Sequence, residues 1–217
     1  MMREHLDQKL TRLNHDLIKM GAMVEEIIDK AIVSLKNQDL EMAKSIYTDD
    51  DAIDEMELSI EKDCLNLIAL QQPIAKDLRR IASALKIITD LERIGDHAVN
   101  IAKVTLEIGK EPLMKPLIDI PKMAEICQRM IKLSLDAFVN QDVELARKVA
   151  EMDQEVDDLY DIVIKEVFEY ISRDSKFLNQ GIKLLFVGRY LERVADHTTN
   201  ICERIIYMVT GERVEIN

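Results

Sequence analysis

Four pairs of acidic residues, each with a spacing of four positions, are the part of this sequence best suited to chemistry. The pairs are Asp50 with Asp54, Glu92 with Asp96, Asp153 with Asp157, and Glu192 with Asp196. Residues four apart share one face of a helix, so each pair places two carboxylates side by side. Carboxylate oxygens in excess suit hard cations such as magnesium, manganese, calcium or iron, and suit zinc less well. The pairs therefore predict cation sites, with solvated helix faces and structural salt links as the alternative.

Each half of the chain places its two pairs symmetrically about a predicted turn. The first two pairs are centred on Pro73, a residue that cannot continue a helix but can begin one. The last two are centred on residues 174 and 175, within the stretch 172–175 that we interpret as a second turn. Antiparallel helices about these turns bring the pairs to equal heights. We call the two predicted groups the first array (Asp50, Asp54, Glu92 and Asp96) and the second array (Asp153, Asp157, Glu192 and Asp196), and expect both to border the core and face outward.

Few neighbouring residues can balance this negative charge. Arg93 and Arg193, three positions before the last acid of each array, are the basic partners that we assign to it, and two arginines cannot neutralise eight acids. Asn100 and Asn200 continue the acidic stripe by one turn; they either complete a cation shell or form a hydrogen bond between helices. His97 and His197 point away from the stripe and are expected to pack or to line an interface.

Long amphipathic helices must position these residues. Apolar residues recur at spacings of three and four from Leu6 to Ala31, which predicts a helix over about residues 3–36. Similar patterns over residues 40–70 and 78–105 predict two more. The chain has only 6 glycines and 4 prolines in 217 residues, too few for a turn-rich β sandwich or barrel.

The helical pattern then repeats after a segment that holds three of the four prolines. The 20 residues from Asn37 match those from Asn140 at 7 positions, and LERIGDHAVNI matches LERVADHTTNI at 7 of 11. Such self-similarity indicates an internal duplication. The sequence therefore predicts an all-α fold of two tandem antiparallel three-helix bundles, six long helices in all. We place the first repeat at 1–110, a linker at 111–121 and the second repeat at 122–217.

Composition excludes several kinds of partner. The 29 basic and 41 acidic residues give a net charge of −12, which disfavours nucleic acid and anionic lipid as ligands. The longest stretch without a charged residue is 64–75, well short of the roughly 20 apolar residues that span a bilayer. The charged N-terminal residues do not fit a secretory signal, and three widely spaced cysteines suit a reducing cytoplasm. We expect no membrane insertion and no disulfide.

Enzymatic motifs are absent from the sequence. None of the four histidines follows a glutamate by three positions, as a carboxylate-bridged di-iron oxidase requires. The phosphate-binding loop, the nucleophile elbow and the zinc-protease motif are missing as well. A metal-assisted hydrolase would need a concave pocket beside an array. We therefore expect a protein without catalytic residues.

Two stretches, DLERIGDHAVNIAK and YLERVADHTTNICER, resemble the PhoU family of bacterial phosphate-signalling proteins, and the resemblance covers the whole chain. It implies two similar three-helix bundles with surface multinuclear iron or zinc sites at Glu/Asp-x-x-x-Asp motifs, which here are the eight acids of the two arrays. Magnesium or manganese are the other cations to consider. One departure from exact duplication is Ala195 in place of Gly95, which we expect to alter helix packing without touching the ligands.

The resemblance also implies a function. It suggests a homodimeric cytoplasmic adaptor at the inner face of the membrane, and a negative regulator of the phosphate-starvation response and of phosphate uptake. Its partners would be PstB, the ATPase subunit of the phosphate ABC transporter, and the sensor kinase PhoR. The alternative is a metal-storage or metal-dependent hydrolytic protein with the same bundle.

Overall fold

The first repeat consists of three long antiparallel helices. The computed structural model describes residues 2–216, with side chains from Leu6 onward. Helix α1 (Met2–Asn37), helix α2 (Leu40–Gln71) and helix α3 (Ala75–Ile108) follow the predicted segments closely. The Asp39 side chain begins α2 by accepting hydrogen bonds from the free backbone N–H groups of its first turn. The turn before α3 holds Pro73 and follows Gln72, whose φ of 46° ends α2.

The second repeat has the same course with one interruption. It contains α4 (Asp119–Asn140), α5 (Val143–Glu151), α6 (Asp153–Arg173), a short 3₁₀ turn (Ser175–Phe177) and α7 (Leu178–Thr210). Asp142 caps α5 as Asp39 caps α2. The predicted all-α fold of two duplicated three-helix units is confirmed. The fifth of the six predicted helices, however, is divided into α5 and α6. The break is at Met152, whose backbone N–H bonds to the carbonyl of Val149 in a tighter 3₁₀ turn.

The connection between the repeats runs from residue 109 to residue 118. The predicted linker, 111–121, extends further, because Asp119 and the next residues through Pro121 already form the first turn of α4. A proline is tolerated there because first-turn N–H groups have no partner within the helix. The Gln180 side chain holds the connection by donating to the Pro112 carbonyl and accepting from the Met114 N–H. The outer limits that we predicted for the repeats, residues 1 and 217, lie outside the described residues.

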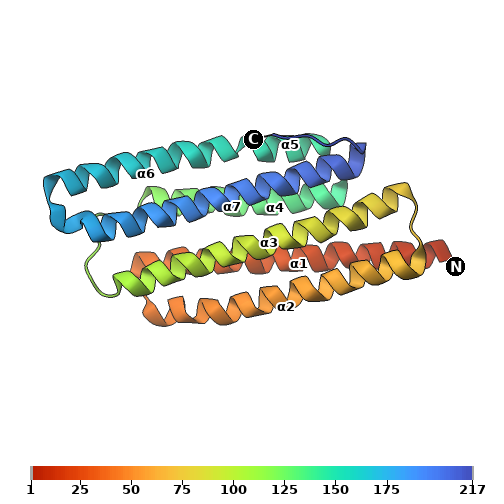
Figure 1. Ribbon diagram of the computed structural model, residues 1–217, viewed down its shortest axis with the longest axis horizontal. Coiled ribbons are helices and arrows are strands. Elements are labelled where there is room, and N and C mark those ends of the chain that lie inside the picture. Colours follow the sequence, from red (N-terminus) through yellow and green to blue (C-terminus); the bar gives the residue numbers. More distant parts are fainter. Residues whose placement is uncertain (1, 217) are drawn as a thin grey trace.

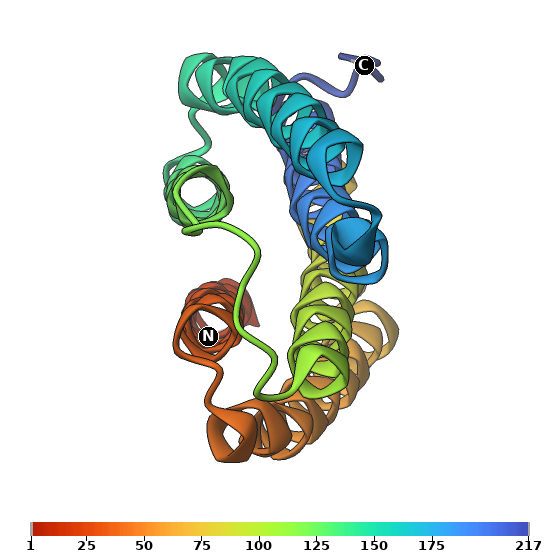
Figure 2. The ribbon, with the colours of Figure 1, turned by 90° about the vertical axis from the view of Figure 1, so that its left-hand side faces the viewer.

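The two repeats pack along their whole length rather than end to end. Helices α3 and α7 run side by side through the middle of the molecule, and α1 lies beside α4 (Figures 1 and 2). Buried apolar side chains from both repeats form one continuous core, in which Leu17, Leu91, Phe138 and Leu191 are fully enclosed. No helix within residues 2–216 has the length and apolar character needed to cross a membrane.

Equivalent histidines of the two repeats meet where α3 crosses α7. The ring centroids of His97 and His197 are 5.6 Å apart. His97 stacks on Tyr190 at 5.9 Å, and the Nδ1 atom of His197 lies 3.0 Å from the Oδ1 atom of Asp90, the residue that corresponds to Tyr190. Burial lowers the pKa of His97 to about 4, so its ring is neutral at neutral pH. These histidines therefore belong to the interface between the repeats, as expected.

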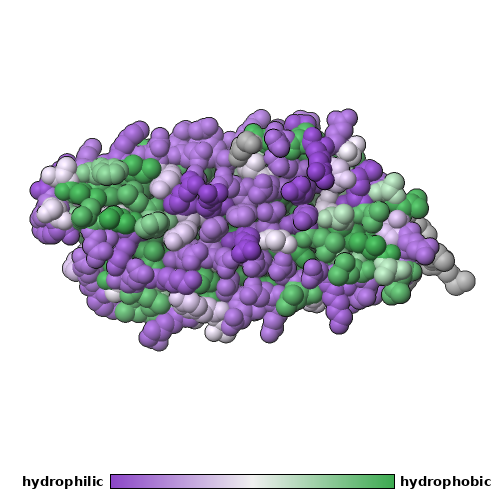
Figure 3. Space-filling model, in the orientation of Figure 1, coloured by the Kyte–Doolittle hydropathy of each residue, from purple (hydrophilic) through white to green (hydrophobic). Residues whose placement is uncertain are grey.

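Apolar side chains are exposed near the two ends of the molecule, with a hydrophilic region between them (Figure 3). One group surrounds the turn between α6 and α7 and includes Phe168, Leu178 and Ile182. The other surrounds the turn between α2 and α3 and includes Leu70 and Ile74.

Candidate metal centre

The first array lies along the contact between α2 and α3. Asp50 and Asp54 lie on α2, and Glu92 and Asp96 lie on α3. Burial, followed by the charges of Asp54, Asp96 and Glu92, raises the pKa of Asp50 from 3.8 to about 6. Burial and then Asp96 also raise the pKa of Asp54, and burial raises that of Glu92. All four predicted carboxylates thus lie together, because the two helices meet in the predicted register.

Helix α3 approaches the side chain of Asp50 closely at Gly95. A Cβ atom on Gly95 would lie 2.9 Å from the Oδ1 atom of Asp50. Only glycine leaves room for that carboxylate where it now lies. We expected the change from Gly95 to Ala195 to leave the predicted ligands untouched, but a Cβ atom at position 95 would crowd Asp50, which is one of them.

Gly95→Ala is expected to weaken cation binding by the first array roughly 10-fold, since displacing a ligand from its supported position has effects of this size. Calorimetric titration of the purified chain with manganese ions would measure the affinity. Ala195→Gly, at the equivalent position of the second repeat, is the control and should leave the first array unchanged. Equal affinities for Gly95→Ala and the wild type would contradict this prediction.

Asp50→Asn is expected to stabilise the metal-free protein at neutral pH. The pKa of Asp50 is 3.8 in a free chain and about 6 when folded, so the folded state binds the extra proton between these values. Stability from this residue therefore falls as pH rises through that window. At about pH 7.5 the variant should gain about 1–2 kcal/mol, after allowance for solvent screening, and at about pH 4 the gain should vanish. Urea unfolding with a chelator present, at both pH values, measures the difference, and a gain independent of pH would contradict it.

Arg93 partly neutralises the first array. Its Nη1 atom lies 3.1 Å from the Oδ2 atom of Asp96, and its Nε atom lies 3.5 Å from the Oε2 atom of Glu92. These carboxylates, Glu92 first, raise the pKa of the guanidinium further. The Oδ1 atom of Asn100 accepts a hydrogen bond from Lys103.

The second array is similar but not identical. Burial and then Asp196 raise the pKa of Asp157, and burial raises that of Glu192, with Asp196 and Asp157 contributing. Asp153 is only 6% exposed and lies near enough to the Cys127 thiol to help raise its pKa. Asp153, Asp157 and Asp196 line one open hollow of about 520 Å³ between α6 and α7. The last described residue, Ile216, lines the same hollow.

Arginine pairing also differs between the arrays. Arg193 repeats the role of Arg93, with its Nη1 atom 3.4 Å from the Oδ2 atom of Asp196. A second arginine, Arg189, pairs with Glu192 and is not among the predicted basic partners. Its spacing of three before Glu192 could have revealed it, but the equivalent residue in the first repeat is Thr89, so a search for repeated residues passes over it.

The side chain of Asn200 takes part in the contact between the repeats. Asn200 donates a 3.5 Å hydrogen bond to the Oδ1 atom of Asp90, across the contact between α7 and α3. Of the two roles considered for it, the structure shows the bond between helices. Among the residues that the structure describes, no three histidine, cysteine, aspartate or glutamate side chains are already arranged to hold a metal ion.

Comparisons with known proteins agree on one family. The model of the PhoU domain matches this sequence twice, at residues 17–105 and 120–205. The chain is 42% identical to the phosphate-specific transport system accessory protein PhoU homolog of Clostridium acetobutylicum, over the full length of both proteins. It is 41% identical to the homolog of Aquifex aeolicus, over 97% of this chain and 95% of that one.

The solved structures that resemble this chain are also PhoU proteins. The crystal structure of the phosphate transport system regulatory protein PhoU from Streptococcus pneumoniae superposes with a TM-score of 0.90 at 33% identity, covering 97% of this chain and all of that one. PhoU from Pseudomonas aeruginosa superposes with a TM-score of 0.88, also at 33% identity, over 95% of this chain and 99% of the other.

Proposed function

The chain belongs to the PhoU family, and from this premise we propose that it is a negative regulator of the phosphate-starvation response that acts as a cation-binding adaptor without catalytic activity. Its place is the cytoplasm, beside a phosphate ABC transporter. Full-length relatives are named accessory or regulatory proteins of phosphate transport, which supports this setting. The single observation that carries the cation-binding part is the convergence of four carboxylates on a partly exposed helix pair.

The donor set fits a hard cation. Burial and the neighbouring acids raise the pKa values of Asp50, Asp54 and Glu92, so a bound positive charge would relieve the repulsion at this site. Their oxygens suit iron, magnesium or manganese, and zinc is a further candidate. Asp50, Asp54, Glu92 and Asp96 would hold the cation in the first repeat, and Asp153, Asp157, Glu192 and Asp196 in the second. A bound cation would supply charge neutralisation and crosslink two helices of one repeat.

Partner proteins would bind the surfaces that these helices present. We assign the adaptor two partners, the ATPase subunit PstB of the transporter and the sensor kinase PhoR. The exposed apolar side chains near the ends of the molecule, among them Leu70 at 75% and Phe168 at 58% exposure, offer area that a partner would cover.

A deletion strain tests the proposal against the metal-storage or hydrolytic alternative. Loss of the gene should give constitutive expression of a phosphate-starvation reporter in high phosphate, and the wild-type gene should restore repression. A variant in which the four acids of the first array are amides should fail to restore it. The matched control removes four exposed acids outside the arrays: Glu61, Glu125, Glu144 and Glu212. Normal repression in the deletion strain, with disturbed cellular metal content, would favour the alternative.

A further inference from the structure

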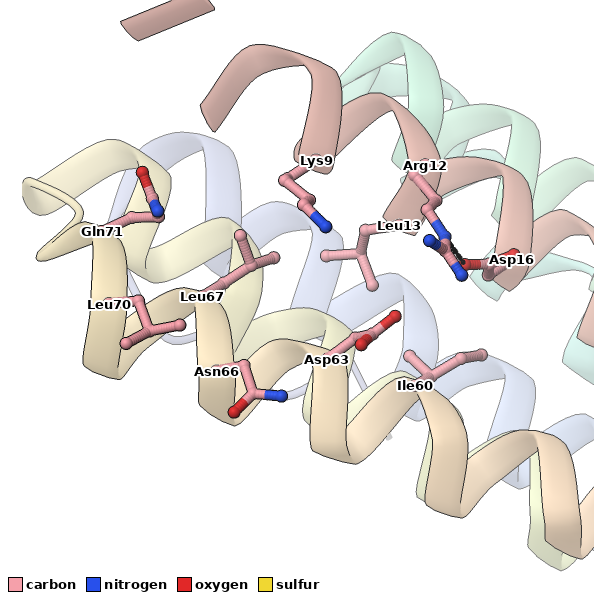
Figure 4. A pocket seen from close by; sticks show the side chains of 10 residues that line it. All are labelled: Lys9, Arg12, Leu13, Asp16, Ile60, Asp63, Asn66, Leu67, Leu70 and Gln71. Carbon is pink, nitrogen blue, oxygen red and sulfur yellow. Dashed lines mark ion pairs between the residues drawn. The ribbon is translucent and has the colours of Figure 1, made fainter. Parts of the chain in front are cut away.

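A cavity between α1 and α2 lies apart from both arrays and is not used by the proposed function. Its volume is about 290 Å³, just below the smallest typical small-molecule sites, so only a small ligand would fit. The buried side chains of Leu13, Ile60 and Leu67 form an apolar floor, and polar side chains surround it (Figure 4). An apolar floor with a few polar groups is typical of a ligand site.

Opposite charges face the cavity from its two walls. Lys9 of α1 and Asp63 of α2 both extend toward the open space in Figure 4. Arg12 turns instead along its own helix, where its Nε atom lies 3.6 Å from the Oδ2 atom of Asp16. Within the described part of the chain, neither Lys9 nor Asp63 forms an ion pair. A cationic and an anionic group are therefore available at one apolar surface.

In the second repeat, the residue equivalent to Asp63 forms an ion pair. Asn37 aligns with Asn140, and the same shift aligns Arg12 with Lys115 and Asp63 with Glu166. Lys115 comes from the connection before α4, is only 7% exposed and forms an ion pair with Glu166. In that repeat, the ammonium group beside the acidic residue is supplied by the chain itself, from Lys115. In the first repeat the corresponding residue, Arg12, is paired with Asp16. Asp63 therefore has no basic partner equivalent to Lys115 among the described residues.

We propose that this cavity binds a free α-amino acid with an apolar side chain. The amino group of the ligand takes the place at Asp63 that the Lys115 ammonium has at Glu166. Its carboxylate lies toward Lys9, and its side chain covers Leu13 and Leu67. The site is present only in the first repeat, because α4 begins at Asp119, the equivalent of Asp16, and has no helical turns that match Lys9 to Leu13. It is therefore separate from the duplicated arrays.

Titration of the full-length chain with L-leucine tests the proposal. The methyl NMR signals of Leu13 and Leu67 should shift saturably at millimolar ligand. Two analogues, 4-methylpentanoate without the amino group and 3-methylbutylamine without the carboxylate, should each bind about 10-fold more weakly, the equivalent of one lost charge contact. Equal binding of either analogue would overturn the assignment, and so would the absence of saturable shifts with both L-leucine and L-phenylalanine.

Variants separate binding from folding. Lys9→Met and Asp63→Asn should each weaken leucine binding about 10-fold while leaving the melting temperature almost unchanged, because Lys9 is exposed and Asp63 is only half-buried. Lys19→Met and Glu61→Gln, exposed positions on the same two helices outside the cavity, are the matched controls and should bind normally. Unchanged affinity in Asp63→Asn would also overturn the proposal. Because neither variant alters an array, this outcome is independent of the proposed cation sites.

Discussion

Changing the four acids of the first array to amides, as Asp50→Asn, Asp54→Asn, Glu92→Gln and Asp96→Asn, is expected to abolish cation uptake by the first repeat. The amides keep the shape of the side chains but remove the charges that would hold a cation. In the metal-free state the same change removes mutual repulsion, so the variant should be more stable than the wild type by about 2 kcal/mol. The variant should thus bind less metal and yet unfold later when metal is absent.

Adding a cation should make the wild type more stable than the variant. A ligand at about 100 times its dissociation constant stabilises the folded state that binds it by about 2.7 kcal/mol. The wild type gains this at both arrays, whereas the variant gains it only at the second. Elemental analysis of dialysed protein and thermal unfolding with and without manganese measure the two effects. The variant lacking Glu61, Glu125, Glu144 and Glu212 controls for net charge. An unchanged metal content per chain would disprove the assignment of these four ligands.

Phe138→Ala is expected to destabilise the whole chain by about 3–5 kcal/mol, the cost of truncating a buried aromatic side chain and leaving a cavity. Phe138 lies near the end of α4 with no exposed surface. For a chain of this length the melting temperature should fall by roughly 10 °C. Phe168→Ala, at a position with 58% exposure, is the control and should change stability by less than about 1 kcal/mol.

The same variant tests whether the repeats unfold together. Because one core runs through both repeats, loss of Phe138 in the second should also lower the stability of the first. Hydrogen exchange at the amides of α2 and of α6 would then accelerate by similar factors. Faster exchange confined to the second repeat would show instead that the two units unfold independently.

The sequence was sufficient to predict the helices, the duplication and the register between helices. Register could be predicted because a four-residue spacing and the position of a turn determine which residues of two antiparallel helices lie at one height. Asp50, Asp54, Glu92 and Asp96 therefore meet as expected. The lack of room for a Cβ atom between position 95 and Asp50 depends on how closely α2 approaches α3, a distance that no spacing encodes.

Differences between the two repeats were harder to predict from the sequence than the features they share. Arg189 has no basic counterpart in the first repeat, and the break at Met152 has no counterpart in α2, so reasoning from duplication missed both. The pair of Lys115 with Glu166 joins residues far apart in the sequence, and only the packing of the connection beside α6 brings them together. Such contacts arise from tertiary structure rather than from local pattern.

The course of the C-terminus affects how this protein should be prepared. After Gly211 the chain turns back, the Ile216 N–H donates a hydrogen bond to Glu203, and Ile216 reaches the hollow that holds Asp157 and Asp196. A polyhistidine purification tag fused at this end would place extra imidazole ligands beside those carboxylates and distort any count of bound ions. An affinity tag at the other terminus, followed by its proteolytic removal, avoids that artefact.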